Sequence, residues 1–209
     1  MTLAVDGRSG SGKTTLAAAL AAHLPGAVVL HTDDISWYES FFGWDHLMAA
    51  GILLPLRHGE DVAFRPPAWD RRGRGGSITV SASAPVVIVE GVGSSRRGLS
   101  TLIDASVWVH ADSDESYRRG IDRDGGTDEA AAFWAEWARE ERGFLFEDRP
   151  WERAAVIVCG TPDLVPPGHI DHGPQGELAA LLGHDPAAAR PDVLTAVREG
   201  GHEDLACRC

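Results

Sequence analysis

Lysine is nearly absent from this chain of 209 residues, since Lys13 is the only one and the other basic residues are arginines. Basic charge as a whole is scarce, and the formal net charge is −12 at pH 7. A nucleic-acid groove needs a basic face, so we expect no nucleic-acid partner. A small anionic ligand is not excluded, because one local loop can bind phosphates on an acidic protein.

Cysteines and long hydrophobic runs are also scarce. The three cysteines, Cys159, Cys207 and Cys209, form no disulfide framework, which favours a reducing compartment. No apolar run approaches the roughly 18 residues that a membrane span needs. A strand pattern starts at residue 2, so we expect no signal peptide and a cytoplasmic location without a membrane partner.

What the chain does have is a glycine loop between a short apolar run, residues 3–5, and an alanine- and leucine-rich stretch to about His23. This is the pattern G-x-x-x-x-G-K-[ST] after a strand and before a helix, which predicts a phosphate-binding loop. We expect Lys13 to reach the β- and γ-phosphates of a nucleotide and the Thr14 hydroxyl to bind Mg²⁺. The residues expected to hold the nucleotide are Gly7, Arg8, Ser9, Gly10, Ser11, Gly12, Lys13, Thr14 and Thr15.

The single lysine supports this interpretation. A chain that uses arginine everywhere else keeps a compact ammonium at the one position where the motif requires it. The same scarcity argues against a GTPase switch of the usual form, because its guanine-specific Asn/Thr-Lys-x-Asp motif needs a lysine beyond position 13.

Two acids follow the second predicted parallel strand, residues 27–30. They are Asp33 and Asp34, and ligands of open α/β sheets lie beyond the carboxyl ends of the strands. A carboxylate there can take a proton from an acceptor hydroxyl or hold the metal ion, and we assign Asp33 to these roles. The alternative is that one of the two acids only caps the next helix.

Residues 36–80 read as an insertion on the acceptor side. Its aromatic residues either pack a helix onto the sheet or line an acceptor pocket. They are Trp37, Tyr38, Phe41, Phe42 and Trp44. Short strands are expected near 61–65 and 77–80, and the arginines of the insertion are either anion receptors or surface residues. These arginines are Arg65, Arg71, Arg72 and Arg74.

The most strongly β stretch, residues 85–89, ends in Glu90-Gly91. A buried strand that delivers an acid beside a phosphate loop is the Walker B arrangement, with Glu in place of the usual Asp. We expect Glu90 to hold Mg²⁺ through water or to fix the acceptor. A further strand is predicted at 106–110.

Residues 112–126 start with a helix cap and first-turn acids. Arg119 and Arg123 lie four residues apart and share a helix face, with Arg118 adjacent, which is typical of a hinged lid that clamps phosphates. The alternative is that these arginines pair with acids of their own helix. Those acids are Asp114, Glu115 and Asp122.

The rest of the chain is predicted as a helix, a strand and a tail. In the helix over 127–147 we expect Phe133, Trp134, Trp137 and Leu145 to be core residues. A last strand over 154–159 leads to a loop, 160–163, that is expected to flank the adenine. Residues 165–209 are expected to form a loosely ordered tail with one helix near 186–199.

Together these features resemble the uridine kinase-like branch of the P-loop nucleoside and nucleotide kinases. The resemblance covers residues 1–164 and is carried by residues 5–15, Asp33-Asp34, Glu90-Gly91 and the run from Arg118-Arg119 to Arg123-Asp124. One departure is Ile35-Ser36, where the family usually has an aromatic pair after the acid. The resemblance implies an α/β P-loop fold of three layers around a mainly parallel five-stranded sheet.

It also implies the activity. Such an enzyme would move the γ-phosphate of ATP, with Mg²⁺, to a hydroxyl of a small molecule, a nucleoside first. Asp33 would be the general base, and Arg119 and Arg123 would neutralise the phosphate. Two alternatives stay open: a kinase for another small alcohol (a sugar, cofactor precursor or antibiotic), and a P-loop ATPase or nucleotide sensor without acceptor. The sequence carries no signal of oligomeric state.

Overall fold

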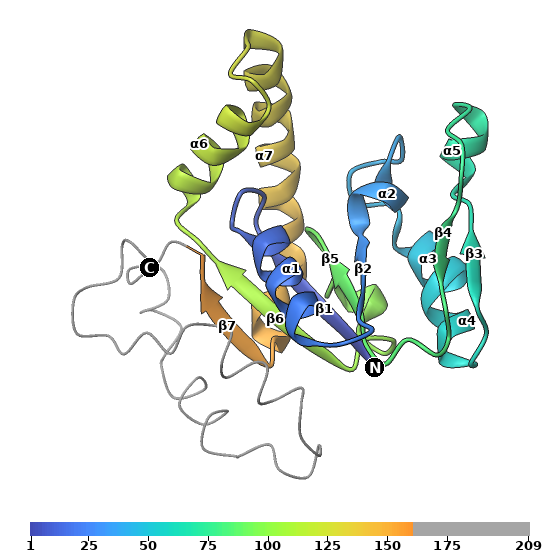
Figure 1. Ribbon diagram of the computed structural model, residues 1–209. Helices are drawn as coiled ribbons and strands as arrows, with labels where there is room; N and C mark the ends of the chain where they lie inside the picture. Colours follow the sequence, from blue (N-terminus) through green and yellow to red (C-terminus); the bar gives the residue numbers. More distant parts are fainter. Residues whose placement is uncertain (161–209) are drawn as a thin grey trace.

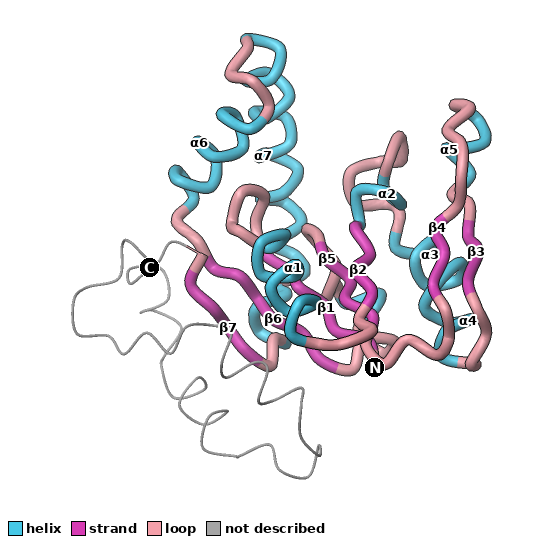
Figure 2. Tube along the Cα trace, viewed as in Figure 1, coloured by secondary structure: helices cyan, strands magenta, loops and turns pink. Residues whose placement is uncertain are grey.

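The predicted five-stranded parallel sheet is confirmed in a computed structural model, which describes residues 1–160. The strand order is β2-β5-β1-β6-β7, and every neighbouring pair is parallel. The strands are β1 (Thr2–Gly7), β2 (Val28–His31), β5 (Val87–Glu90), β6 (Ala105–His110) and β7 (Val156–Cys159). Parallel strands end at one edge of the sheet, so the loops after β1, β2 and β5 meet there (Figure 2).

Helices cover both faces of the sheet. The α-helices are α1 (Lys13–His23), α2 (Thr32–Ser36), α3 (Asp45–Met48), α4 (Leu54–Arg57), α5 (Pro67–Arg71), α6 (Ser113–Arg123) and α7 (Asp128–Asp148). A π-helix, η1 (Ala49–Leu53), joins α3 to α4, and η2 (Arg97–Leu99) and η3 (Pro150–Arg153) are 3-10 helices. Figure 1 shows α1 in front of the sheet and α7 descending behind it.

The core has two parts because successive strand residues point to opposite faces. Val87 and Val89 of β5 pack into a cluster with α2, α3 and η1, whereas Val86 and Ile88 pack into a second cluster with α1, β1 and β6. Both faces of β5 are therefore buried, which explains its continuous apolar sequence. This burial fixes the positions at which the strands deliver their polar end residues.

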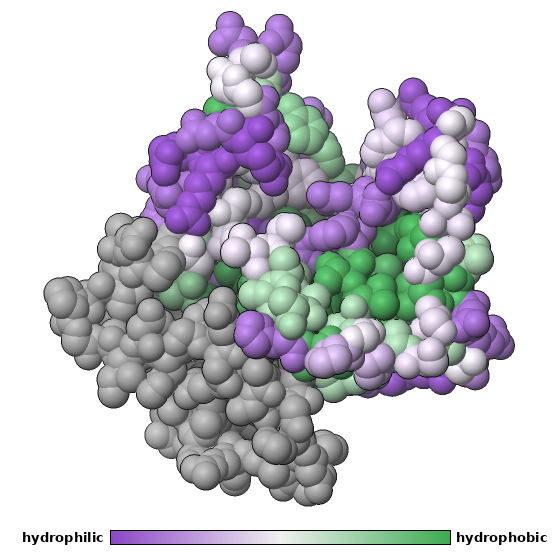
Figure 3. Space-filling model, in the orientation of Figure 1, coloured by the Kyte–Doolittle hydropathy of each residue, from purple (hydrophilic) through white to green (hydrophobic). Residues whose placement is uncertain are grey.

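Two arms rise past the carboxyl ends of the strands (Figure 1). The α6–α7 arm is residues 113–148. The hairpin arm consists of β3 (Val62–Phe64), α5 and β4 (Ile78–Val80); the two strands lie where the sequence predicts short strands, and the structure pairs them antiparallel. Hydrophilic residues cover the outer ends of both arms, and hydrophobic residues gather between the arms at the level of the sheet (Figure 3). Within the described range no helix is long and apolar enough to cross a membrane.

Candidate active site

The glycine loop leads from β1 into α1 and is packed tightly on its outer side. A Cβ at Gly10, where φ is +76°, would lie 2.1 Å from the carbonyl oxygen of Ser116 in α6, so only glycine fits. At Gly12, in contrast, a Cβ would meet no atom within 4 Å. No side chain caps the start of α1, so no side-chain acceptor occupies its first N–H groups. Such a helix start favours an anion.

Lys13 lies within this loop, with only 7% of its surface exposed. Its Nζ donates a hydrogen bond to the carbonyl oxygen of Arg8 at 2.7 Å. Burial lowers the pKa of Lys13, while the negative charges of Glu90 and Asp6 oppose that effect. The ammonium is thus held against the backbone of the glycine loop.

Glu90, the last residue of β5, connects α1 and β2 at the end of the sheet. It is 5% exposed, and its Oε1 accepts a hydrogen bond from Thr14 Oγ1 at 3.2 Å. Its Oε2 lies 2.7 Å from Nδ1 of His31, which is the residue opposite it in the β2–β5 register. The structure thereby joins the Thr14 hydroxyl, next to the glycine loop, to the acid predicted at the end of the buried strand. The contact with His31 was not anticipated from the sequence.

The two acids after β2 have different partners. Asp34 Oδ1 is bound by the guanidinium of Arg74, from the hairpin arm. Asp33 instead opens onto a pocket next to the glycine loop. Displacement of water by the surrounding protein raises the pKa of Asp33, and the nearby negative charge of Glu90 raises it further, against the opposing charges of Lys13 and Arg123. Of the two acids, Asp33 is the one that faces a space for a ligand.

The pocket of Asp33 has a volume of about 510 Å³. Its walls come from the glycine loop, α2 with the segment after it, and the α6–α7 arm. Its lining residues are Ser9, Asp33, Ser36, Trp37, Tyr38, Glu39, Phe41, Arg123, Phe133, Trp134 and Trp137. Part of the predicted aromatic cluster therefore lines a pocket, whereas Trp44, 1% exposed, belongs to the core. Aromatic walls with a few polar groups are typical of sites for small molecules.

Two expectations for α7 need correction. Phe133 was expected in the core but is 50% exposed, and Trp137 lines the pocket instead of packing into a core cluster. Both rings contact Phe41 from the aromatic segment, with ring centroids 6.2 and 5.2 Å away. These residues meet a segment that lies about ninety positions earlier in the chain, which helical periodicity cannot reveal. Trp134 and Leu145 are buried as predicted.

The predicted lid arginines separate into three environments. Arg118 is paired with Glu115 and Asp122 on the exposed side of α6, as in the alternative interpretation. Arg119 donates to Glu115 and, through Nη1, to the carbonyl oxygen of Gly160 at 2.9 Å. Arg123 lines the pocket of Asp33. Its Nε contacts its neighbour in the chain, Asp124, at 2.9 Å.

The arginines of residues 36–80 are engaged with the protein itself. Arg65 donates to Asp70 and to carbonyl groups of its own loop, and Arg71 donates to Glu39. Arg72 lies over the Tyr38 ring at 4.0 Å, and Arg74 lies over the Trp69 ring at 3.8 Å. These contacts favour the surface interpretation over an anion receptor.

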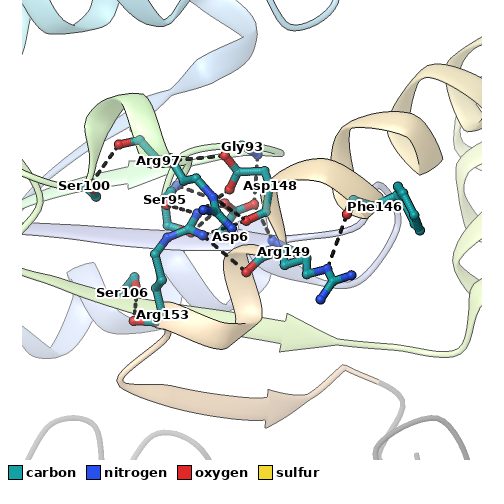
Figure 4. A network of polar contacts seen from close by, with 11 residues as sticks. Asp6, Gly93, Ser95, Arg97, Ser100, Ser106, Phe146, Asp148, Arg149 and Arg153 are labelled. Atoms are coloured by element: carbon teal, nitrogen blue, oxygen red, sulfur yellow. Dashed lines mark hydrogen bonds and ion pairs between the residues drawn. The ribbon is translucent and has the colours of Figure 1, made fainter. Parts of the chain in front are cut away.

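Asp6 is a structural residue whose role the sequence did not reveal. It is fully buried, and its carboxylate accepts four hydrogen bonds: from the N–H groups of Gly7, Gly93 and Ser95 and from the Ser95 hydroxyl. Burial raises the pKa of Asp6, and these hydrogen bonds oppose the rise. Figure 4 shows the carboxylate at the centre of this network. Asp6 thereby ties the glycine loop to the loop that follows Glu90.

Glu141 was also missed. It is 3% exposed on α7, and its carboxylate contacts both the Arg8 side chain and the N–H of Ser9. A signal does exist in the sequence: Glu141 lies seven residues after Trp134 and four before Leu145, on the buried stripe of the helix. A charged residue on an apolar stripe indicates a buried polar partner.

The residues at the end of the sheet fit Mg²⁺. The Thr14 hydroxyl, the carboxylate of Glu90 that it contacts and the nearby carboxylate of Asp33 are hard oxygen donors. Among residues 1–160 no group of three or more His, Cys, Asp and Glu side chains is arranged to hold a metal ion. Mg²⁺ does not need such a cage, because it keeps several waters and binds one or two carboxylates together with substrate phosphates.

Some predictions concern residues outside the described range. These are the adenine-flanking loop beyond Gly160, the tail over 165–209 with its helix near 186–199, and the pair Cys207 and Cys209.

Comparison with known proteins extends the fold assignment. No protein-family model and no curated protein sequence matches the chain. A solved structure of a "putative fructose transport system kinase" from Silicibacter sp. TM1040 has a TM-score of 0.52 and 24% identity, covering 76% of this chain and 89% of that one. A "Possible Uridine Kinase" from Bacillus stearothermophilus has a TM-score of 0.47 and 22% identity, covering 75% and 87%. The first of these structures shows that the chain shares the fold of that protein.

Proposed function

We propose that the protein is an ATP- and Mg²⁺-dependent phosphotransferase that moves the γ-phosphate of ATP to a hydroxyl group of a small molecule. The observation that carries the proposal is the meeting of two features at one edge of the sheet. The glycine loop with Lys13 and the Thr14–Glu90 contact offers a site for nucleotide phosphates and a metal ion. Beside it, Asp33 faces an aromatic pocket of about 510 Å³.

In this proposal the chain acts mainly by positioning and by neutralising charge. The N–H groups of the glycine loop and the ammonium of Lys13 bind the phosphates of ATP. Mg²⁺, when bound through Thr14, Glu90 and Asp33, would neutralise phosphate charge and orient the phosphate oxygens. Asp33 accepts the proton of the acceptor hydroxyl, and Arg119 and Arg123 stabilise the charge on the transferring group.

The pocket of Asp33 supports the part of the proposal that concerns the phosphate acceptor. Aromatic walls suit a molecule with a flat apolar face, so a nucleoside is the first acceptor to test. Another small alcohol, such as a sugar, a cofactor precursor or an antibiotic, is the next. A nucleotide-sensing ATPase without acceptor would have no use for an acid that faces such a pocket.

The test is release of ADP from ATP and Mg²⁺ across a panel of nucleosides, nucleoside monophosphates, sugars and pantothenate-like alcohols. The Lys13→Ala variant is the blank, and Arg139→Ala, on the exposed side of α7, is the control for substitution of a basic residue. Stimulation by one acceptor class in the wild type and in Arg139→Ala, lost in Lys13→Ala, supports the proposal and identifies the acceptor. Hydrolysis that no acceptor changes contradicts it.

A further inference from the structure

The peptide group between Arg8 and Ser9 is held from two opposite sides. Its carbonyl oxygen accepts a hydrogen bond from Lys13 Nζ at 2.7 Å. Its N–H donates to Glu141 Oε1, also at 2.7 Å. One partner is the lysine of the glycine loop, and the other is a buried acid on α7, more than 130 positions away in the chain.

The geometry of the peptide bond determines which side of the Arg8–Ser9 peptide faces Lys13 and which side faces Glu141. No peptide bond among residues 1–160 is cis, and in a planar trans peptide the C=O and N–H point to opposite sides. The carbonyl therefore points to Lys13, and the N–H points away from it to α7. A rotation of the peptide plane by half a turn would bring the carbonyl oxygen against the Glu141 carboxylate. Two acceptors in a buried place repel each other, so Glu141 permits only one orientation.

Other contacts hold Glu141 and the loop together. The Arg8 guanidinium lies 3.4 Å from Glu141 Oε2 and compensates its charge. From the preceding turn of α7, Trp137 Nε1 donates to the Ser9 hydroxyl at 2.7 Å. Hydrogen bonds to a buried charged acceptor are stronger than neutral ones, so the carboxylate is the main element of this clamp.

We propose that Glu141 is a positioning residue that fixes the Arg8–Ser9 peptide and, through its carbonyl oxygen, the ammonium of Lys13. Glu141 contacts Arg8 and Ser9 of the glycine loop and does not itself line the pocket of Asp33. Its effect on catalysis rests on the proposed function, because it assumes that Lys13 binds the phosphates of ATP. Its effect on Lys13 does not depend on that function.

The test uses Glu141→Gln, with Glu140→Gln as the matched control on the exposed side of the same helix. A glutamine has nearly the shape of the glutamate, but its amide can accept from the Ser9 N–H or donate to the Arg8 carbonyl, so it no longer selects one orientation. Because Lys13 is the only lysine in the chain, labelling with ε-¹³C-lysine gives a single NMR signal, provided that any purification tag lacks lysine. Affinity for ATP is measured in parallel with a fluorescent ATP analogue.

We expect Glu141→Gln to shift or split the Lys13 signal and to weaken ATP binding by about tenfold or more, while Glu140→Gln changes neither. A general loss of packing would lower the melting temperature without moving the signal of the folded form. If Glu141→Gln does not fold, Trp137→Phe keeps an aromatic ring at this position and removes the donor to Ser9. It should shift the same signal to a smaller extent.

The two proposals fail in different ways. A Lys13 signal and an ATP affinity that Glu141→Gln leaves unchanged overturn the positioning role and leave the phosphotransferase proposal intact. A Lys13 signal that shifts in a protein that binds no ATP in its wild-type form supports the positioning role and overturns the function.

Discussion

Replacement of Asp6 by Asn removes one acceptor from the buried network that ties the glycine loop to residues 93–95. Each carboxylate oxygen accepts two hydrogen bonds: Oδ1 from the N–H groups of Gly7 and Gly93, and Oδ2 from the N–H and the hydroxyl of Ser95. An asparagine must present its NH₂ group to one of these pairs. The less costly orientation places the NH₂ group toward Ser95. The Ser95 hydroxyl can then rotate and accept a hydrogen bond from the NH₂ group, and only the backbone N–H of Ser95 loses its acceptor.

The expected loss of folding free energy follows from that one lost hydrogen bond and from the loss of the carboxylate charge. A buried donor without acceptor costs about 1–3 kcal/mol, and the hydrogen bonds that remain lose their charged acceptor. Against this, burial raises the pKa of Asp6, so the carboxylate carries a desolvation cost that Asn avoids. We therefore expect a loss of about 2 kcal/mol, which in a chain of this length lowers Tm by about 4–8 °C.

The assay is denaturant unfolding at neutral pH together with thermal unfolding. The control is Asp122→Asn, whose side chain is 63% exposed and pairs with Arg118 on the surface. That variant should stay within about 0.5 kcal/mol of the wild type. A loss below about 1 kcal/mol for Asp6→Asn, or a gain in stability, would refute the reasoning that this carboxylate organises the two loops.

Two further predictions concern acids elsewhere in the chain. Asp33→Asn should lower kcat by about 10²-fold or more with ATP binding retained. Asp34→Asn should lower kcat far less, because the Asp34 carboxylate is paired with Arg74. Steady-state kinetics measure both variants, and a larger loss of kcat in Asp34→Asn than in Asp33→Asn would assign the general base to Asp34. The N–H of Ala82 lowers the pKa of Asp61 below its usual 3.8, so Asp61 stabilises the fold above that pH and loses this effect as pH falls through its folded pKa. The Tm difference between wild type and Asp61→Asn should therefore shrink in acid, and a difference that grows in acid would contradict this.

The sequence predicted best where a residue's role depends on its neighbours in the chain. The glycine loop, the helix that follows it to His23 and the burial of the strand before Glu90 follow from local pattern and composition. Because parallel strands end at one edge of the sheet, it could also place Asp33 and Glu90 at that edge. These features define the phosphate half of the candidate site.

The sequence alone could not predict the roles of residues that depend on contacts between distant segments of the chain. Asp34 is distinguished from Asp33 by an arginine forty residues away on the hairpin arm. Arg118 and Arg119 are adjacent, yet only the second reaches the end of β7. Phe133 fits the helical period of a core residue but lies at a pocket, because Phe41 approaches α7 there. Tertiary contacts of this kind override local periodicity.

Phosphorus NMR of the reaction tests the central claim most directly, because it shows where the γ-phosphate of ATP goes. The protein is incubated with Mg²⁺, ATP and the acceptor that most stimulates ADP release, beside Lys13→Ala and Asp33→Asn. The account predicts a phosphate monoester signal that grows with ADP in the wild type, is absent in Lys13→Ala and is strongly slowed in Asp33→Asn. Inorganic phosphate as the only product, formed equally with and without acceptor, would contradict it.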